Sequence, residues 1–94
     1  MITSSKAKEM LIQHVKFLAN VNAKAAYRLA DKIQEEINTL KYSPKRTSKY
    51  EIIKNCQYRR LIINKKYLVI YFINQETVYI DYIFDCRRLI NNQI

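Results

Sequence analysis

Glycine is absent from the 94-residue sequence. The phosphate-binding loops of nucleotide-binding folds need a backbone that approaches the ligand closely, and a side chain blocks that approach. The absence therefore excludes a P-loop NTPase and a Rossmann enzyme. Tight turns must use asparagine instead, since it best tolerates positive φ after glycine. Asn64 and Asn74 stand between apolar runs, so we expect both to form hairpin turns.

Cysteine and histidine are nearly as scarce. Cys56 and Cys86 fit no metal-ligand spacing, and the only histidine is His14, so we expect reduced structural thiols, no metal and no other cofactor. His14 lies beside an apolar helical face, where a packed histidine is more common than a catalytic one, and we assign it no role.

Long apolar runs are also missing. No segment has the length of a bilayer span, and the N-terminal MITSSKAKEM lacks the apolar region of a secretory signal. We therefore expect a cytoplasmic protein with no membrane partner.

The first forty residues have the apolar spacing of two amphipathic helices. The first is expected over Ser5–Leu18, with Ser4 or Ser5 as its N-cap. The second follows Asn22, a candidate N-cap, and ends near Leu40. The link between the helices is short, which predicts an antiparallel helix hairpin.

The second half of the sequence changes to the period of β-strands. A connector, Lys41–Cys56, contains the only proline, Pro44. Three β-rich runs follow: Tyr58–Ile63, Tyr67–Ile73 and Val78–Phe84. Short links between them predict an antiparallel meander of at least three strands. The expected fold is thus α+β, one domain over residues 1–94, with the helix hairpin on one sheet face. Because the middle run is apolar on both faces, a C-terminal segment, a second copy or a protein partner should cover part of the other face.

Positive charge is concentrated in one segment. The net charge is +9, and residues 41–66 carry nine cations and one anion. A solvated charge run is the plain alternative, but such an excess favours binding to a polyanion or an acidic protein. Two more arginines follow the third strand and could enlarge the patch. The candidate target-binding residues are Lys45, Arg46, Lys49, Arg59, Arg60, Lys65, Lys66, Arg87 and Arg88.

The order of these elements resembles the RelE/ParE superfamily of bacterial toxins from type II toxin–antitoxin modules. The resemblance rests on the second helix, NAKAAYRLADKIQEEINTL, and on the strand segment YRRLIINKKYLVIYFINQETVYIDYIFDCRR. Family members usually begin with a strand before the first helix, whereas only Met1, Ile2 and Thr3 precede the serine pair. That strand is therefore shortened, or the chain starts late.

The resemblance leaves two branches open. In RelE-like ribosome-dependent mRNA endonucleases, an arginine typically follows the tyrosine of the strand that reads YLVIY here, but this chain has Leu68 at that position. If the protein is a ribonuclease, Arg59, Arg60 and Arg88 are the candidate phosphate-stabilising residues. ParE-like toxins, which include plasmid stabilisation proteins, also lack that arginine and act on DNA gyrase without catalysis.

The residues and the resemblance together leave three hypotheses. A gyrase-poisoning, growth-arresting toxin comes first, an mRNA endonuclease second, and a basic binding module without toxicity third. Both toxin hypotheses imply a cognate antitoxin. We expect its binding segment to be amphipathic and acidic, because such a segment would cover apolar surface and neutralise the basic patch.

Overall fold

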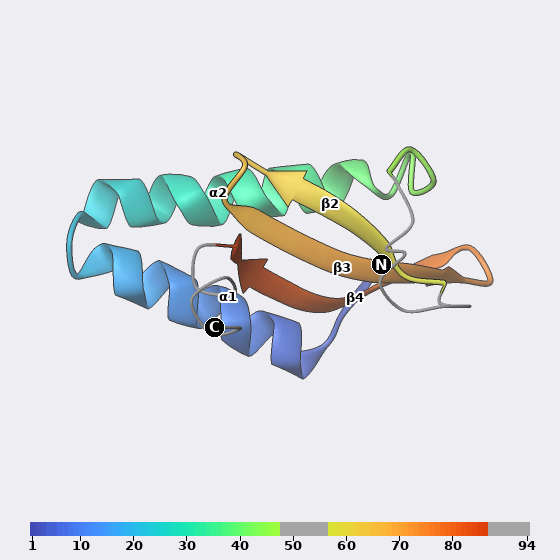
Figure 1. The fold of residues 1–94 in the computed structure, drawn as a ribbon, viewed down its shortest axis with the longest axis horizontal. Helices are drawn as coiled ribbons and strands as arrows, with labels where there is room; N and C mark the ends of the chain where they lie inside the picture. Colours follow the sequence, from blue (N-terminus) through green and yellow to red (C-terminus); the bar gives the residue numbers. More distant parts are fainter. Residues whose placement is uncertain (48–56, 87–94) are drawn as a thin grey trace.

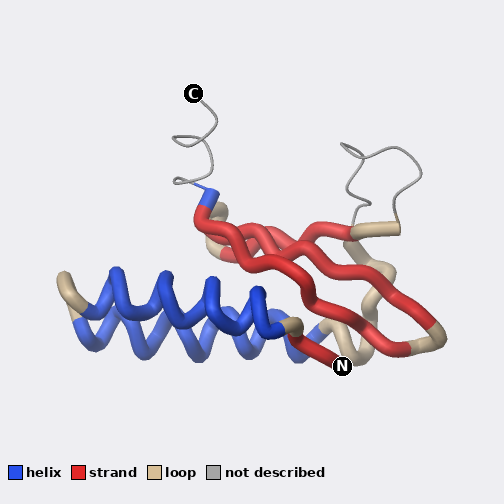
Figure 2. The backbone as a smooth tube through the Cα atoms, turned by 90° about the horizontal axis from the view of Figure 1, so that it is seen from below, coloured by secondary structure: helices blue, strands red, loops and turns tan. Residues whose placement is uncertain are grey.

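The computed structural model describes residues 1–47 and 57–86 (Figure 1). Two helices form one layer and a four-stranded sheet forms the other (Figure 2). The elements in chain order are β1 (Ile2–Thr3), α1 (Ser5–Ala19), α2 (Ala23–Thr39), β2 (Arg59–Ile63), β3 (Tyr67–Asn74) and β4 (Thr77–Asp85). The predicted α+β architecture is confirmed. None of these helices is long and apolar enough to cross a membrane.

Side-chain caps begin both helices. Ser4 has an extended backbone, and its Oγ accepts a hydrogen bond from the Ala7 N–H at 3.0 Å. Asn22 caps α2 in the same way, since its Oδ1 accepts from the Ala25 N–H at 3.1 Å. Each cap satisfies one of the amide groups that the first helical turn leaves without an intrahelical partner. The predicted helix starts are therefore confirmed.

The sheet is mixed, and the prediction of an antiparallel meander was incomplete. Strands β2, β3 and β4 form the expected meander, but β1 pairs in parallel with β4 and gives the order β1-β4-β3-β2. The two-residue β1 is held by the residue after it. The Ser4 N–H donates to the Ile80 carbonyl at 2.8 Å, and the Ser4 hydroxyl donates to the Asp81 carbonyl at 3.0 Å. A strand of two residues is thus present before α1.

The hairpin turns show one correct prediction and one error. Asn64 has a φ of 53°, as expected, and Lys65 follows with 59°. Asn74, however, is the last residue of β3 and pairs with Thr77, so positive φ falls on Gln75 and Glu76. A two-residue hairpin loop of this type needs positive φ at both central positions, and the strand register decides which residues occupy them.

A β-bulge in β4 sets which side chains face the helices. Tyr71 pairs with Ile80 while Ile70 pairs with Tyr82, which leaves Asp81 as the extra residue. The buried positions of β4 change parity across Asp81 as a result. The buried residues packed between the helices and the sheet are Ala7, Leu29, Ile33, Ile37, Leu40, Leu61, Ile63, Tyr67, Val69, Tyr71, Val78, Ile80 and Ile83.

The outer sheet face is rich in aromatic side chains. Phe72 stacks on Tyr79 with ring centroids 4.9 Å apart and meets Tyr58 edge-on at 5.5 Å. Leu68 and Ile70 on this face are buried, whereas Ile62 is 53% exposed. The first five residues of β3 are therefore buried on both faces of the sheet, in keeping with their apolar sequence.

Candidate functional site

The predicted basic patch divides into two groups at opposite ends of β2. Three of its nine residues, Lys49, Arg87 and Arg88, lie outside the described residues. The first group, here called the connector end, comprises Lys45, Arg46, Arg59 and Arg60. The second, the turn end, comprises Lys65 and Lys66 in the β2–β3 turn. An antiparallel strand rises about 3.4 Å per residue, so the five residues of β2 span roughly 14 Å between the groups.

At the connector end, Arg59 holds the connector against the sheet. Its Nη1 donates to the Thr47 carbonyl at 2.7 Å and to the Lys45 carbonyl at 3.4 Å, and the side chain is half-buried. Tyr71, which pairs with Arg59 across the sheet, donates from its fully buried hydroxyl to the Pro44 carbonyl at 2.7 Å. The Thr47 hydroxyl also hydrogen bonds to that of Tyr71. Arg59 and Tyr71 together fix the end of the connector.

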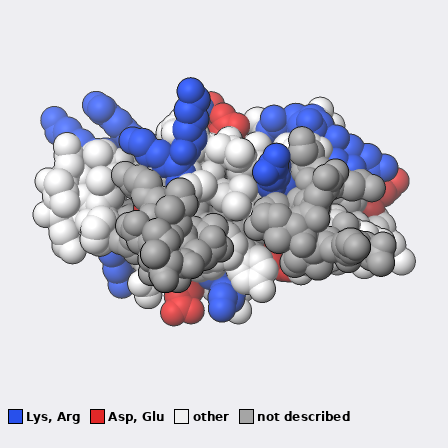
Figure 3. All heavy atoms as spheres, viewed as in Figure 1, with Lys and Arg blue, Asp and Glu red and all other residues white. Residues whose placement is uncertain are grey.

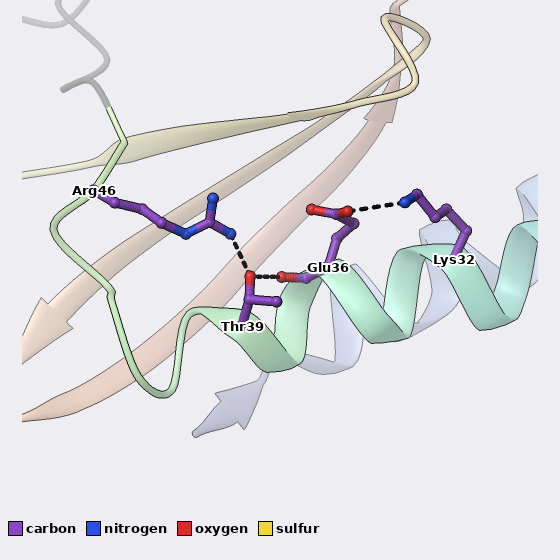
Figure 4. Close-up of polar contacts among 4 residues, drawn as sticks. All are labelled: Lys32, Glu36, Thr39 and Arg46. Atoms are coloured by element: carbon purple, nitrogen blue, oxygen red, sulfur yellow. Dashed lines mark hydrogen bonds and ion pairs between the residues drawn. The ribbon is translucent and has the colours of Figure 1, made fainter.

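Arg46 attaches the same connector to the C-terminal end of α2 (Figure 4). Its Nη2 donates to the Thr39 hydroxyl, which donates in turn to the Glu36 carbonyl at 2.6 Å. The Glu36 carboxylate forms an ion pair with Lys32 at 3.0 Å. This hydrogen bond and the charge of Glu36 raise the pKa of Lys32 above its ordinary value. Arg46 and Arg59 thus both have partners within the chain, while Lys45 and Arg60 are exposed.

At the turn end, the structure brings two helical cations to one of the two predicted turn lysines, Lys66. A pocket of about 320 Å³, here called the turn-end pocket, lies between α2 and the β2–β3 turn. Figure 3 shows Lys and Arg side chains along the rim where α2 and β2 run in Figure 1. The pocket is lined by Leu18, Ala25, Arg28, Leu29, Lys32, Asn64, Lys66 and Tyr67.

The backbone of the β2–β3 turn positions Lys66 firmly. Consecutive positive φ values at Asn64 and Lys65 reverse the chain, and the Lys66 N–H donates to the Ile63 carbonyl at 3.0 Å. The Lys66 carbonyl accepts from the Cys86 N–H at 2.7 Å. Both backbone polar groups of Lys66 are therefore satisfied, one within the hairpin and one by the residue after β4.

Sequence reasoning missed Arg28 and Lys32 because residues 1–40 carry six cations against four anions. The sequence nevertheless contained a signal that could have pointed to these two residues. The two cations are four positions apart on α2 and therefore share one face of the helix. Leu29 and Ile33, each one position later, belong to the buried core. The pair thus lies beside the buried stripe, where side chains can border a neighbouring element.

Comparison with known proteins identifies the family. The family described as "ParE toxin of type II toxin-antitoxin system, parDE" matches residues 1–90. The chain belongs to the ParE toxin family. A solved structure, "Chromosomal ParDE TA system from P. aeruginosa", is similar in fold, with a TM-score of 0.77 and 13% sequence identity. The similarity covers 88% of this chain and 90% of that chain. A search of curated proteins found no match.

Membership in the ParE family implies a cognate antitoxin as partner. It also gives Leu68 a context, because this position holds an arginine in the RelE-like ribonucleases described above. Leu68 is 8% exposed and pairs with Ile62 on one side and Phe84 on the other. A buried apolar side chain on the outer sheet face thus occupies the position at which the resemblance to RelE-like ribonucleases would place an arginine.

His14 is a buried structural residue of this ParE fold, as expected. Its Nε2 lies 2.7 Å from the Ile83 carbonyl, and its ring centroid is 5.6 Å from that of Tyr67. A carbonyl only accepts, so Nε2 carries the proton. Nδ1 is buried and has no hydrogen-bond partner among the described residues. His14 joins α1 to β4 and lies within the helix–sheet interface.

Proposed function

We propose that the protein is a ParE toxin that acts in the cytoplasm by binding DNA gyrase, with no chemical step of its own. The toxin unit in this proposal is a single domain over residues 1–94. The observation that carries the proposal is Leu68, a buried leucine at the RelE arginine position in a chain that matches the ParE family over residues 1–90.

The contacts of the remaining candidate residues also favour binding over catalysis. Cleavage of RNA by a 2′-hydroxyl needs a proton acceptor, a group that stabilises the phosphate and a proton donor for the leaving oxygen. Arg59, a candidate for the second role, donates to two carbonyls of its own chain. His14 donates to Ile83 inside the helix–sheet interface. Arg60 and Lys45 are exposed and are the described connector-end cations best placed to contact a target.

The test compares DNA damage with mRNA cleavage in bacteria that express the protein without its antitoxin. We expect gyrase-linked DNA breaks and an SOS response, and we expect purified protein to trap gyrase on cleaved plasmid. Fresh codon-specific cuts in mRNA with intact DNA would overturn the proposal and favour the RelE-like endonuclease. A chain that is harmless when expressed alone would favour the basic binding module.

A matched pair of variants assigns the target-binding surface. Arg60→Gln should weaken toxicity, because Arg60 is an exposed cation at the connector end. Lys8→Gln removes the same charge from an exposed position on α1, in the helix layer, and should remain as toxic as the unmodified protein. Equal toxicity of both variants would show that Arg60 is only part of a solvated face.

A further inference from the structure

The turn-end pocket has a composition that the connector end lacks. Two cations come from α2 and one from the β2–β3 turn, and Asn64 adds an amide group beside them. The volume of about 320 Å³ is at the small end of the range for ligand pockets, which suits a few side chains rather than a folded element.

The charge of the pocket is only partly balanced. Lys32 is paired with Glu36 at 3.0 Å, and this is the one salt bridge within residues 1–47 and 57–86. In that same part of the chain, neither Arg28 nor Lys66 has a side-chain hydrogen bond or an ion pair. Two cations from separate elements therefore border one pocket whose described lining residues include no anion, which favours an anionic ligand group.

The buried residues that line the pocket, here called its floor, indicate which kind of anionic group the pocket binds. Leu29 and Tyr67 line it and are 7% and 5% exposed, and Leu18 from α1 packs beside the core. A phosphate group would contact only the cations and gain nothing from this floor. A protein segment with a carboxylate next to an apolar side chain would use both, since apolar contact gives affinity and paired charge gives specificity.

We propose that the turn-end pocket binds an acidic amphipathic segment of the cognate antitoxin. One carboxylate of that segment pairs with Arg28 and Lys66, and a neighbouring apolar side chain lies on Leu29 and Tyr67. The planar guanidinium of Arg28 can hold a carboxylate through two parallel hydrogen bonds. The inference rests on the toxin role proposed above, but it places the antitoxin contact at the turn end of β2.

The turn presents Lys66 in a pre-organised position. Its N–H and carbonyl are both hydrogen bonded, at 3.0 Å to Ile63 and at 2.7 Å to Cys86, so the backbone that carries the ammonium group is fixed before the partner arrives. Binding then orders one side chain rather than a loop, which lowers the entropic cost of the complex.

Charge reversal with an adjacent control tests the proposal. The probe is the purified cognate antitoxin, and its affinity is measured by calorimetry for Arg28→Glu, Lys66→Glu and Lys65→Glu. Lys65 is exposed in the same turn but does not line the pocket, so Lys65→Glu makes the same charge change beside it. We expect roughly 10- to 100-fold weaker binding for the two pocket variants and a change of less than about threefold for the control.

A growth assay separates this inference from the proposed gyrase target. Arg28→Glu, at a residue outside the candidate target-binding set, should arrest growth like the unmodified protein when expressed alone, and the antitoxin should fail to rescue it. Replacing the responsible antitoxin carboxylate with lysine should restore binding to Lys66→Glu. Equal binding by all three variants would overturn the inference, as would an Arg28→Glu variant that binds the antitoxin normally but loses toxicity. Because binding is measured directly, the inference can fail or hold whether or not gyrase is the target.

Discussion

The two ends of β2 carry similar charges but use them differently. At the connector end, Arg59 and Arg46 donate to Thr47, Lys45 and Thr39 of the same chain. At the turn end, Lys66 joins Arg28 at a pocket, and neither has a side-chain partner among the described residues. A cation that is already hydrogen bonded contributes to the fold, whereas an unpaired cation beside an apolar floor is available to a partner. The density of positive charge along the sequence does not distinguish these two uses.

Substitution of Tyr71 by phenylalanine should have the largest effect on stability at the connector end. The change removes a fully buried hydroxyl that donates to the Pro44 carbonyl at 2.7 Å and leaves that acceptor without this donor. We expect the free energy of unfolding to fall by about 2 kcal/mol, measured by urea denaturation. Tyr79→Phe on the outer face makes the same chemical change, and we expect a loss below about 0.5 kcal/mol. Equal losses would show that the connector contributes little to the fold.

Arg59→Ala tests the second attachment of the connector. Its guanidinium donates to two carbonyls, one at 2.7 Å and one at the longer distance of 3.4 Å, from a half-buried position. We expect a loss of about 1 kcal/mol in urea denaturation, less than for Tyr71 because solvent can replace part of the interaction. Arg60→Ala removes the same charge one position later from an exposed site and should cost less than about 0.5 kcal/mol. If the two variants unfold alike, Arg59 belongs with the target-binding cations after all.

Local patterns predicted most of the fold. The apolar period of 3.6 and the caps Ser4 and Asn22 located both helices, and the change to period 2 located the three meander strands. Only the family resemblance suggested a strand before the first helix. The residue pattern did not locate β1, because two residues carry no period and its pairing depends on contacts of Ser4 with Ile80 and Asp81 far along the sequence. The bulge at Asp81 also depends on tertiary contacts, since nothing in the local pattern of β4 indicates an extra residue.

The candidate site was predicted less completely than the fold. Counting charge by segment located Lys65 and Lys66 but treated them as one patch with Arg59 and Arg46. Hydrogen bonds from a side chain to a distant carbonyl have no sequence signature, so the structural use of these arginines was hidden. Arg28 was missed because it enters the site only when α2 packs beside the β2–β3 turn.

The two hairpin turns differ in the residues that take positive φ, and this difference can be tested by a substitution with a smaller expected effect. The β2–β3 turn begins with Asn64, which tolerates positive φ, but the β3–β4 turn places Gln75 and Glu76 at 50° and 68°. We expect Glu76→Gly to raise the free energy of unfolding by about 0.5 kcal/mol, because the strain relieved exceeds the added freedom of the unfolded chain. The same replacement at Thr77, which lies within β4, should be destabilising. A loss of stability for Glu76→Gly would mean that the strand register, and not the residue in the turn, limits the stability of this hairpin.

Replacement of Lys32 should lower the stability of the fold slightly, and the size of this loss should depend on pH. The hydrogen bond and charge of Glu36 raise the pKa of Lys32 above 10.5, its ordinary value, in the folded state. The pair therefore stabilises the fold at every pH below 10.5 at which Glu36 is ionised, and this contribution is lost as pH rises through the raised value. Lys32→Gln should be slightly less stable than the unmodified protein at neutral pH, and the difference should disappear in strongly alkaline buffer. A difference that persists there would assign it to packing of the lysine chain instead.

The smallest change in stability is expected at the turn end, for the double variant Arg28→Gln and Lys66→Gln. Neither side chain has a hydrogen bond or ion pair among the described residues, so their removal breaks no contact that holds the fold. We expect the free energy of unfolding to change by less than about 0.5 kcal/mol. At low salt we expect a slight gain in the free energy of unfolding, because two like charges at one pocket repel each other. The gain should vanish at high salt, where that repulsion is screened. Urea denaturation at both salt concentrations measures this. A clear loss of stability would mean that the turn end, like the connector end, uses its cations to hold the chain together.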